Sequence, residues 1–203
     1  MGRLPKSFYQ SMDVIRLSKE LIGKKLVSCF GGEKTSGIIV ETEAYLGEID
    51  RASHAYGLRR TARTEIMFQE GGIAYVYLCY GIHYLFNVVV SPKDIPHAIL
   101  IRGIEPVEGI DRMLKRCNKP RLDKTLTAGP GSLTRALGIT TKETGISLIR
   151  NTPIWIEDSK NEIPSEEILS STRIGVDYAK EDALLPYRFL LKGNQYVSRG
   201  KGK

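Results

Sequence analysis

Residues 74–90, with the sequence AYVYLCYGIHYLFNVVV, decide the class of fold that this chain adopts. Aromatic and β-branched side chains dominate the stretch, as they do in pleated sheets, and Gly81 divides it in two. Two strands, 74–80 and 83–90, joined by a turn are therefore expected. A further strand is expected over 98–102. A sheet is thus expected to form the core of the protein.

Outward from this sheet, hydrophobic periodicity and turn residues predict the other elements. A helix should begin at Ser11 or Asp13, each a candidate N-cap, and end by Gly23. The remaining expected elements are strands at 26–30, 37–45, 152–156 and 189–192 with 196–198, and helices at 105–116 and 133–137. Residues 46–72 have no clean period and are expected to form a long loop with one short helical turn. Long loops in compact domains are usually functional.

Length and composition limit the class of protein. With 203 residues, 41% of them hydrophobic, the chain is expected to form one domain over residues 1–203. Strands and helices do not alternate regularly, so the expected fold is α+β, with a mainly antiparallel curved sheet and flanking helices. No apolar run is long enough to cross a membrane, and no apolar segment follows the first charged residues. A cytoplasmic protein that is not secreted is expected.

The charge balance suggests an anionic partner. Thirty Lys and Arg residues face 23 Asp and Glu residues, which gives a formal charge of +7. Net charge of this size favours association with polyanions but identifies no particular ligand.

The first candidate for chemistry is the run Glu41-Thr42-Glu43-Ala44-Tyr45. In a strand, Glu41, Glu43 and Tyr45 share one face, so two carboxylates lie beside an aromatic ring. Spacing alone leaves two interpretations open, a solvated polar face or a catalytic pair of carboxylates. The choice between them depends on the neighbouring residues.

Tyrosines and arginines gather around this run. Six of the ten tyrosines lie between positions 45 and 84, interleaved with His54, Arg59, Arg60 and Arg63. Alternating tyrosines such as Tyr75 and Tyr77 are typical of half-buried strands. Aromatic faces beside guanidinium groups are also what stacked bases and phosphates require, so the cluster favours a nucleic-acid ligand.

Neither a metal nor a cofactor is expected. His54, His83 and His97 have no second His, Cys or carboxylate at the spacing of metal ligands. The glycines at 71–72 and 129–131 match neither dinucleotide-binding nor P-loop motifs.

Short runs in a fixed order cover nearly the whole chain. They are IVETEAYLG at 39–47, SHA at 53–55, MF at 67–68, AYVYLCYG at 74–81, NV at 87–88, RGIEP at 102–106, GPGSL at 129–133, RIGV at 173–176 and PYRF at 186–189. Together they resemble the 3-methyladenine (alkyladenine) DNA glycosylase family. Members of this family flip a damaged purine nucleotide out of duplex DNA and hydrolyse its N-glycosidic bond with water.

The resemblance implies roles for individual residues. Glu43 matches the general base that activates the attacking water, with Glu41 as the alternative. Arg102 matches an arginine beside that carboxylate, where its charge would keep Glu43 ionised. Tyr45 and His54 match two of the rings that hold the flipped base.

The remaining positions of the match concern base and backbone contacts. Tyr77 matches a third ring around the base, and Asn87 matches a residue of the pocket floor that discriminates between purines. Tyr80 matches the wedge that fills the gap left in the duplex. Arg59 matches a phosphate contact, to which Arg60 and Arg63 would add.

The implied partner is double-stranded DNA containing alkylated or deaminated purines, and the implied state is a nucleoid-associated monomer without a cofactor. The chain departs from the family at Thr61-Ala62-Arg63-Thr64, where Thr-Pro-Arg-Asn is expected, and at Gly71, where proline is common. Both changes predict looser loops. A noncatalytic binder of damaged or distorted DNA and a hydrolase of free nucleosides remain as alternatives.

Overall fold

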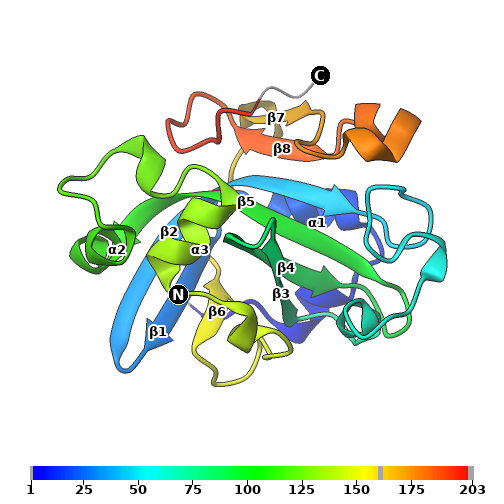
Figure 1. The fold of residues 1–203 in the computed structure, drawn as a ribbon, viewed down its shortest axis with the longest axis horizontal. Helices are drawn as coiled ribbons and strands as arrows, with labels where there is room; N and C mark the ends of the chain where they lie inside the picture. Colours follow the sequence, from blue (N-terminus) through cyan, green and yellow to red (C-terminus); the bar gives the residue numbers. More distant parts are fainter. Residues whose placement is uncertain (1, 160–161, 201–203) are drawn as a thin grey trace.

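An eight-stranded antiparallel sheet forms the centre of the protein, as Figure 1 shows. The computed structural model describes residues 2–159 and 162–200, so the ends of the expected domain 1–203 lie outside the described residues. The strands are β1 (Lys25–Phe30), β2 (Glu33–Tyr45), β3 (Ile73–Cys79), β4 (His83–Val90), β5 (His97–Glu108), β6 (Ile154–Glu157), β7 (Ile168–Ser171) and β8 (Arg188–Leu191). Their order is β3-β4-β5-β2-β1-β6, and β8 pairs with β2 and β7. The expected α+β class is confirmed.

The helices are short and lie around this sheet. They are α1 (Val14–Glu20), α2 (Ile110–Cys117) and α3 (Pro130–Leu137). The 3-10 helices are Lys6–Gln10, Tyr56–Leu58, Glu65–Phe68, Lys124–Leu126, Thr141–Glu143, Ser165–Glu167 and Asp177–Leu184. Within the described ranges, no helix has the length and apolar character needed to cross a lipid bilayer.

The first helix begins as its sequence predicts. The Asp13 carboxylate caps it by accepting a hydrogen bond from the Arg16 N–H. Val14 and Leu17 are buried side chains of this helix. The Thr42 hydroxyl donates to the Ser18 carbonyl oxygen at 2.9 Å, so α1 covers the face of β2 to which Thr42 points. Because side chains alternate along a strand, Glu41 and Glu43 point to the other face.

The third helix covers part of the opposite face. Leu133, Ala136 and Leu137 of α3 are buried, and the Thr134 hydroxyl donates to the Tyr84 carbonyl oxygen of β4 at 2.7 Å. Pro130 opens the helix, where a missing N–H costs nothing, and Gly138 ends it with a φ of 73°. The amino-terminal end of α3 therefore lies beside the β3–β4 hairpin.

Several expected elements differ from the structure. The helix expected over 105–116 is wrong at its start, because β5 continues to Glu108 and α2 begins only at Ile110. The long strand β2 provides pairing partners as far as Glu108, and these outweigh the helical spacing of the side chains. The strand expected at 196–198 is also wrong, and β7 was not expected. The loop 46–72 holds two 3-10 helices rather than one helical turn.

Candidate active site

Most of the predicted site residues surround one cavity of about 580 Å³. Its walls come from β3, β4 and β5, from residues 52–54, from the start of α3 and from residues 174–178. Six predicted residues line it, namely Tyr45, His54, Tyr77, Tyr80, Asn87 and Arg102. The volume falls within the range of small-molecule sites, which is about 300–1,000 Å³.

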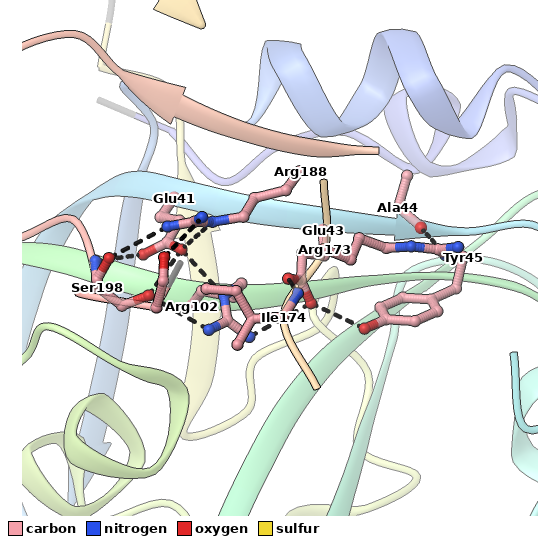
Figure 2. Close-up of polar contacts among 10 residues, drawn as sticks. Glu41, Glu43, Ala44, Tyr45, Arg102, Arg173, Ile174, Arg188 and Ser198 are labelled. Atoms are coloured by element: carbon pink, nitrogen blue, oxygen red, sulfur yellow. Dashed lines mark hydrogen bonds and ion pairs between the residues drawn. The ribbon is translucent and has the colours of Figure 1, made fainter. Parts of the chain in front are cut away.

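Glu43 lies directly behind the cavity wall and is fully buried. As Figure 2 shows, its Oε2 accepts from the Tyr45 hydroxyl at 2.8 Å and from Arg102 Nη1 at 3.3 Å. Its Oε1 accepts from the Ile174 backbone N–H at 2.8 Å. All three donors belong to residues that line the cavity. The carboxylate is therefore one layer of side chains away from any ligand that the cavity holds.

Burial and the nearby carboxylates fix the ionisation of Tyr45 and Arg102, the two side chains beside Glu43. Desolvation, together with the Glu43 carboxylate, raises the pKa of Tyr45 well above its usual value, so its hydroxyl remains a donor. Desolvation lowers the pKa of Arg102, but the Glu43 and Glu41 carboxylates more than compensate and raise it above the usual value. Arg102 is therefore a permanent cation in the cavity wall.

A pair of β-bulges brings Arg102 to this position. Along β2 and β5, Ile39 pairs with Ile104 and Glu41 with Gly103, which leaves Val40 as an extra residue on β2. The register then returns with Thr42 opposite residue 101, so that Arg102 is the extra residue on β5. Bulges re-aim side chains next to active sites. Here the second bulge places Arg102 between the two glutamates.

Glu41 shares the buried face with Glu43, and neither carboxylate is part of the cavity lining. Its carboxylate accepts from Arg102 Nε at 3.0 Å, from Arg188 Nε at 2.7 Å and from both the N–H and the hydroxyl of Ser198. Three of these donors reach Oε1 and one reaches Oε2. Glu43 accepts only three hydrogen bonds, so of the two glutamates it has more acceptor capacity left for a ligand. Figure 2 shows both carboxylates and the arginines around them.

Beside Tyr45 lies a further buried ion pair. The Arg173 guanidinium bonds to both carboxylate oxygens of Asp50, and its Nη1 donates to the Ala44 carbonyl oxygen at 2.9 Å. Its Cζ lies 4.9 Å from the centroid of the Tyr45 ring. This cation packs against one face of the ring. A cation–π contact contributes about 1–2 kcal/mol at desolvated sites.

His54 belongs to a closed network with Tyr75 and Arg63. Arginine only donates, so Arg63 Nη2, 3.2 Å from His54 Nε2, makes that nitrogen the acceptor. Nδ1 then carries the proton and donates to the Tyr75 hydroxyl oxygen at 2.9 Å. Burial, and secondarily the Arg63 charge, lowers the pKa of His54 to about 4. The imidazole is therefore neutral at pH 7.

The rings around His54 form one wall of the cavity. His54 packs edge-on against Tyr77, with centroids 4.7 Å apart, and Tyr75 lies 5.5 Å from Tyr77. The Arg63 guanidinium lies over Tyr77 at 4.7 Å. Arg63 is therefore held by the aromatic wall, and its contact with a phosphate stays a prediction.

Asn87 offers one kind of polar group to a ligand. Its amide nitrogen donates to the backbone carbonyl oxygens of Tyr75 and Leu85 at 3.1 and 3.4 Å. Because both neighbours are acceptors, the amide orientation is determined by its surroundings. The Oδ1 oxygen, an acceptor, is the group left for a ligand.

Tyr80 lies at the tip of the β3–β4 hairpin and is 88% exposed. Its φ is 50° and that of Gly81 is 72°, with a hydrogen bond from the Ile82 N–H to the Cys79 carbonyl oxygen. Positive φ at both central residues suits the twist of hairpin strands but is unfavourable for tyrosine. The turn therefore presents an aromatic side chain to solvent at some cost in strain.

The loop that departs from the resembled family is held in place by its own hydroxyls. The Thr64 hydroxyl accepts from the Thr61 N–H at 2.8 Å and donates to the Arg59 carbonyl oxygen at 2.8 Å. Arg60 forms ion pairs with Glu65 and Asp94, so it too is engaged within the loop. The Arg59 side chain is exposed and lies outside the cavity lining.

Gly71 does not loosen the turn before β3. A Cβ at this position would lie 2.2 Å from the Tyr9 carbonyl oxygen. The Gly71 N–H donates to the Ser91 carbonyl oxygen at 2.9 Å. Only glycine fits this close approach of two backbones, so the expectation of a looser turn is wrong here.

Sequence reasoning left several site residues without a role. Ile174 provides the backbone N–H to Glu43, and Ser198 and Arg188 hold Glu41. The run at 173–176 was part of the resemblance, which is the one signal that pointed to Ile174. Across the part of the chain that the structure describes, no three His, Cys, Asp or Glu side chains gather as a metal site requires.

Comparison with known proteins identifies the family of the chain. Residues 7–195 match the model of a DNA glycosylase family described as Methylpurine-DNA glycosylase (MPG). The chain is 48% identical, over 96% of its length and 98% of the relative's, to a Bacillus cereus (strain G9842) protein named "Putative 3-methyladenine DNA glycosylase". Proteins of the same name from Bacillus thuringiensis (strain Al Hakam) and Bacillus anthracis (strain CDC 684 / NRRL 3495) are 48% and 47% identical over the same shares. The chain belongs to the methylpurine-DNA glycosylase family.

Proposed function

We propose that this protein is a monofunctional base-excision-repair glycosylase that removes alkylated purines from duplex DNA by hydrolysis. The observation that carries the proposal is the buried Glu43 carboxylate behind an aromatic cavity, held by donors from Tyr45, Arg102 and Ile174. The family and the names of the relatives support the substrate class. The protein would act as a monomer without a cofactor, on DNA in the cytoplasm.

The bonding of Glu43 leaves room for the attacking water. A carboxylate has about four acceptor positions, and three donors occupy Glu43. The remaining position suits a water that enters between the lining residues. Glu43 would take a proton from that water as the C1′–N bond breaks, so that the oxygen bonds to C1′ and the purine leaves. Its negative charge would also stabilise the positive charge that develops on the sugar.

The rings of the cavity suit a cationic base. Tyr45, His54 and Tyr77 present aromatic faces and edges, and neutral His54 adds no repelling charge. An alkylated purine with a positive charge is attracted to such rings. The Asn87 oxygen would accept a hydrogen bond from an N–H group on the base.

Base flipping would use the hairpin tip. Tyr80 is exposed at the rim of the cavity, where its ring could take the place of the extruded nucleotide in the stack. Flipping costs a few kcal/mol and least for a damaged base, which contributes to selectivity. The exposed Arg59 would contact a phosphate beside it.

The test is a single-turnover assay on methylated duplex DNA with identification of the released bases. The unmodified protein should release methylated purines, and strand breaks should follow only after alkali. Glu43→Gln should bind the same duplex but release bases at least about 100-fold more slowly, the loss expected for a general base. Glu48→Gln, which removes an exposed carboxylate from the following loop, should keep full activity.

Each other outcome points to an alternative. Binding of damaged duplex without any base release would support the noncatalytic binder. Release from free nucleosides but not from duplex would support a nucleoside hydrolase. Release by Glu43→Gln at the unmodified rate would overturn the assigned base.

A further inference from the structure

The second buried carboxylate, Glu41, accepts four hydrogen bonds, one more than Glu43 accepts. Four hydrogen bonds, from Arg102 Nε, Arg188 Nε and the Ser198 N–H and hydroxyl, reach its two oxygens at 2.6–3.0 Å. Three of these bonds end on Oε1 and one on Oε2, and all four donors are protein groups. The carboxylate therefore acts on other protein groups.

The group it acts on is the Arg102 guanidinium, which is held on three sides. Nε donates to Glu41, Nη1 to Glu43 at 3.3 Å and Nη2 to the Ser198 hydroxyl at 3.2 Å. A planar guanidinium bonded at all three nitrogens has one orientation. Only one of the three bonds reaches Glu43, so Arg102 leaves part of that carboxylate free.

The carboxy-terminal segment closes this arrangement at a position shaped for it. A Cβ on Gly103 would lie 2.7 Å from the Tyr196 carbonyl oxygen and 3.3 Å from Glu41 Oε2. Arg188 Nη2 donates to the Ser198 carbonyl oxygen at 3.1 Å. Gly103 thus permits the close approach, and Arg188 ties the segment to the sheet.

We propose that Glu41 and Ser198 are positioning residues that hold Arg102 and Arg188 away from full pairing with Glu43. The inference rests on the proposed function, in which Glu43 needs one free acceptor position for water. Arg188 pairs directly across from Glu43 on β8, yet its side chain bonds to Glu41. Without Glu41 and Ser198, both guanidinium groups turn to Glu43 and fill the position that water requires.

The sharpest test changes the Ser198 hydroxyl. Ser198→Ala removes its bonds to Glu41 and Arg102 but keeps the backbone N–H, while Ser198→Thr keeps the hydroxyl. Single-turnover base release should fall about tenfold in Ser198→Ala, the effect of losing hydrogen bonds to charged groups, and should recover in Ser198→Thr. Affinity for methylated duplex should stay within about twofold, because Ser198 does not line the cavity.

A matched control separates positioning from stability. Ser18→Ala removes a buried hydroxyl bond of 2.8 Å to Val14 in α1, on the other face of the sheet. It should lower the thermal midpoint comparably and leave the rate of base release unchanged. If Ser18→Ala slows release as much as Ser198→Ala, the effect is one of stability and the proposal is overturned.

A second readout does not depend on activity. The Arg102 Nε–H, assigned by its absence in Arg102→Lys, should exchange slowly with solvent in the unmodified protein and at least about tenfold faster in Ser198→Ala. Equal exchange in the two proteins would overturn the proposal even if Ser198→Ala releases bases more slowly. Should the unmodified protein release no methylated purine, the proposed function fails while the exchange data still decide whether Ser198 positions Arg102.

Discussion

His54 is held in one tautomer and one charge state by its neighbours. The Arg63 guanidinium donates to Nε2, and burial with the same cation lowers the pKa of the imidazole to about 4. A charged imidazole would repel a cationic purine in the same cavity. Neutral His54 therefore suits the proposed substrate over the whole physiological pH range.

This perturbed pKa predicts an acid-sensitive contribution to stability. The folded pKa is about 4 against about 6.5 unfolded, so protonation favours the unfolded state. The contribution is complete above pH 6.5 and is lost as the pH falls towards 4. The difference in free energy of unfolding between the unmodified protein and His54→Gln should change by at most about 3 kcal/mol between pH 7 and 4.

Urea unfolding of both proteins at several pH values measures this difference. Burial also lowers the pKa of His97, but this residue is present in both proteins and its effect cancels. A difference that does not vary with pH would show that His54 titrates normally.

The β3–β4 hairpin carries a tyrosine where glycine or asparagine would be more stable. Tyr80 has a φ of 50° and is 88% exposed, so its ring gains little from packing. Left-handed backbone at a residue of this kind costs about 1–2 kcal/mol. Strain of this kind clusters at functional sites, where it is part of the mechanism.

Tyr80→Asn should therefore change stability and binding in opposite directions. The thermal midpoint should rise slightly, by the equivalent of about 0.5–1 kcal/mol, because asparagine tolerates positive φ. Affinity for methylated duplex should fall about tenfold or more, since a stacked aromatic contributes about 1–3 kcal/mol per base. Met12→Ala, which removes another exposed side chain, is the control and should alter neither. Unchanged affinity in Tyr80→Asn would contradict the wedge.

Local pattern predicted most elements of the fold and failed where long-range pairing decides. The aromatic and β-branched composition of 74–90 predicted β3 and β4, and residues 85–90 of β4 are buried on both faces. Residues 105–108 have helical spacing, yet they pair with the start of β2 and remain extended. Residues 196–198 resemble a strand by composition, but their backbone serves Glu41 and Arg188 instead of a ladder. No local signal separates these cases.

In the candidate site, too, local pattern predicted some residues, whereas long-range contacts decided others. Period-two alternation placed Glu41, Glu43 and Tyr45 on one face, which the structure confirms for the two buried carboxylates and the Tyr45 hydroxyl. The position of Arg102 depends on two bulges, and that of Ser198 on a contact across 157 residues. Neither a bulge nor a distant contact leaves a periodic trace in a single sequence.

The charge of the protein is divided between a balanced interior and a basic exterior. Inside, Arg102, Arg173 and Arg188 are buried with Glu41, Glu43 and Asp50, so their charges cancel. The formal excess of +7 therefore belongs to the rest of the molecule. Charge on the outside attracts a polyanion, whereas the paired charges inside hold the site together.

Binding to undamaged duplex DNA should accordingly weaken steeply with salt. Each neutralised phosphate adds about −0.9 to the slope of log affinity against log salt, and a slope steeper than about −3 is expected. Fluorescence anisotropy from 50 to 200 mM salt measures it. An affinity independent of salt would contradict an electrostatic contact with duplex DNA, and a duplex with an uncharged methylphosphonate backbone is the control.

The contact between Ser198 and Glu41 also has a consequence for the order in which the protein is made. Glu41, Glu43 and Arg102 lie within the first 102 residues to be synthesised, whereas Ser198 follows 157 residues after Glu41. A growing chain can form most of the sheet and the aromatic cavity before the Ser198 hydroxyl and amide exist. The last step of assembly at Arg102 thus waits until the segment around Ser198 has left the ribosome. A chain that stops before Ser198 would carry every predicted catalytic residue and still lack the group that orients Arg102.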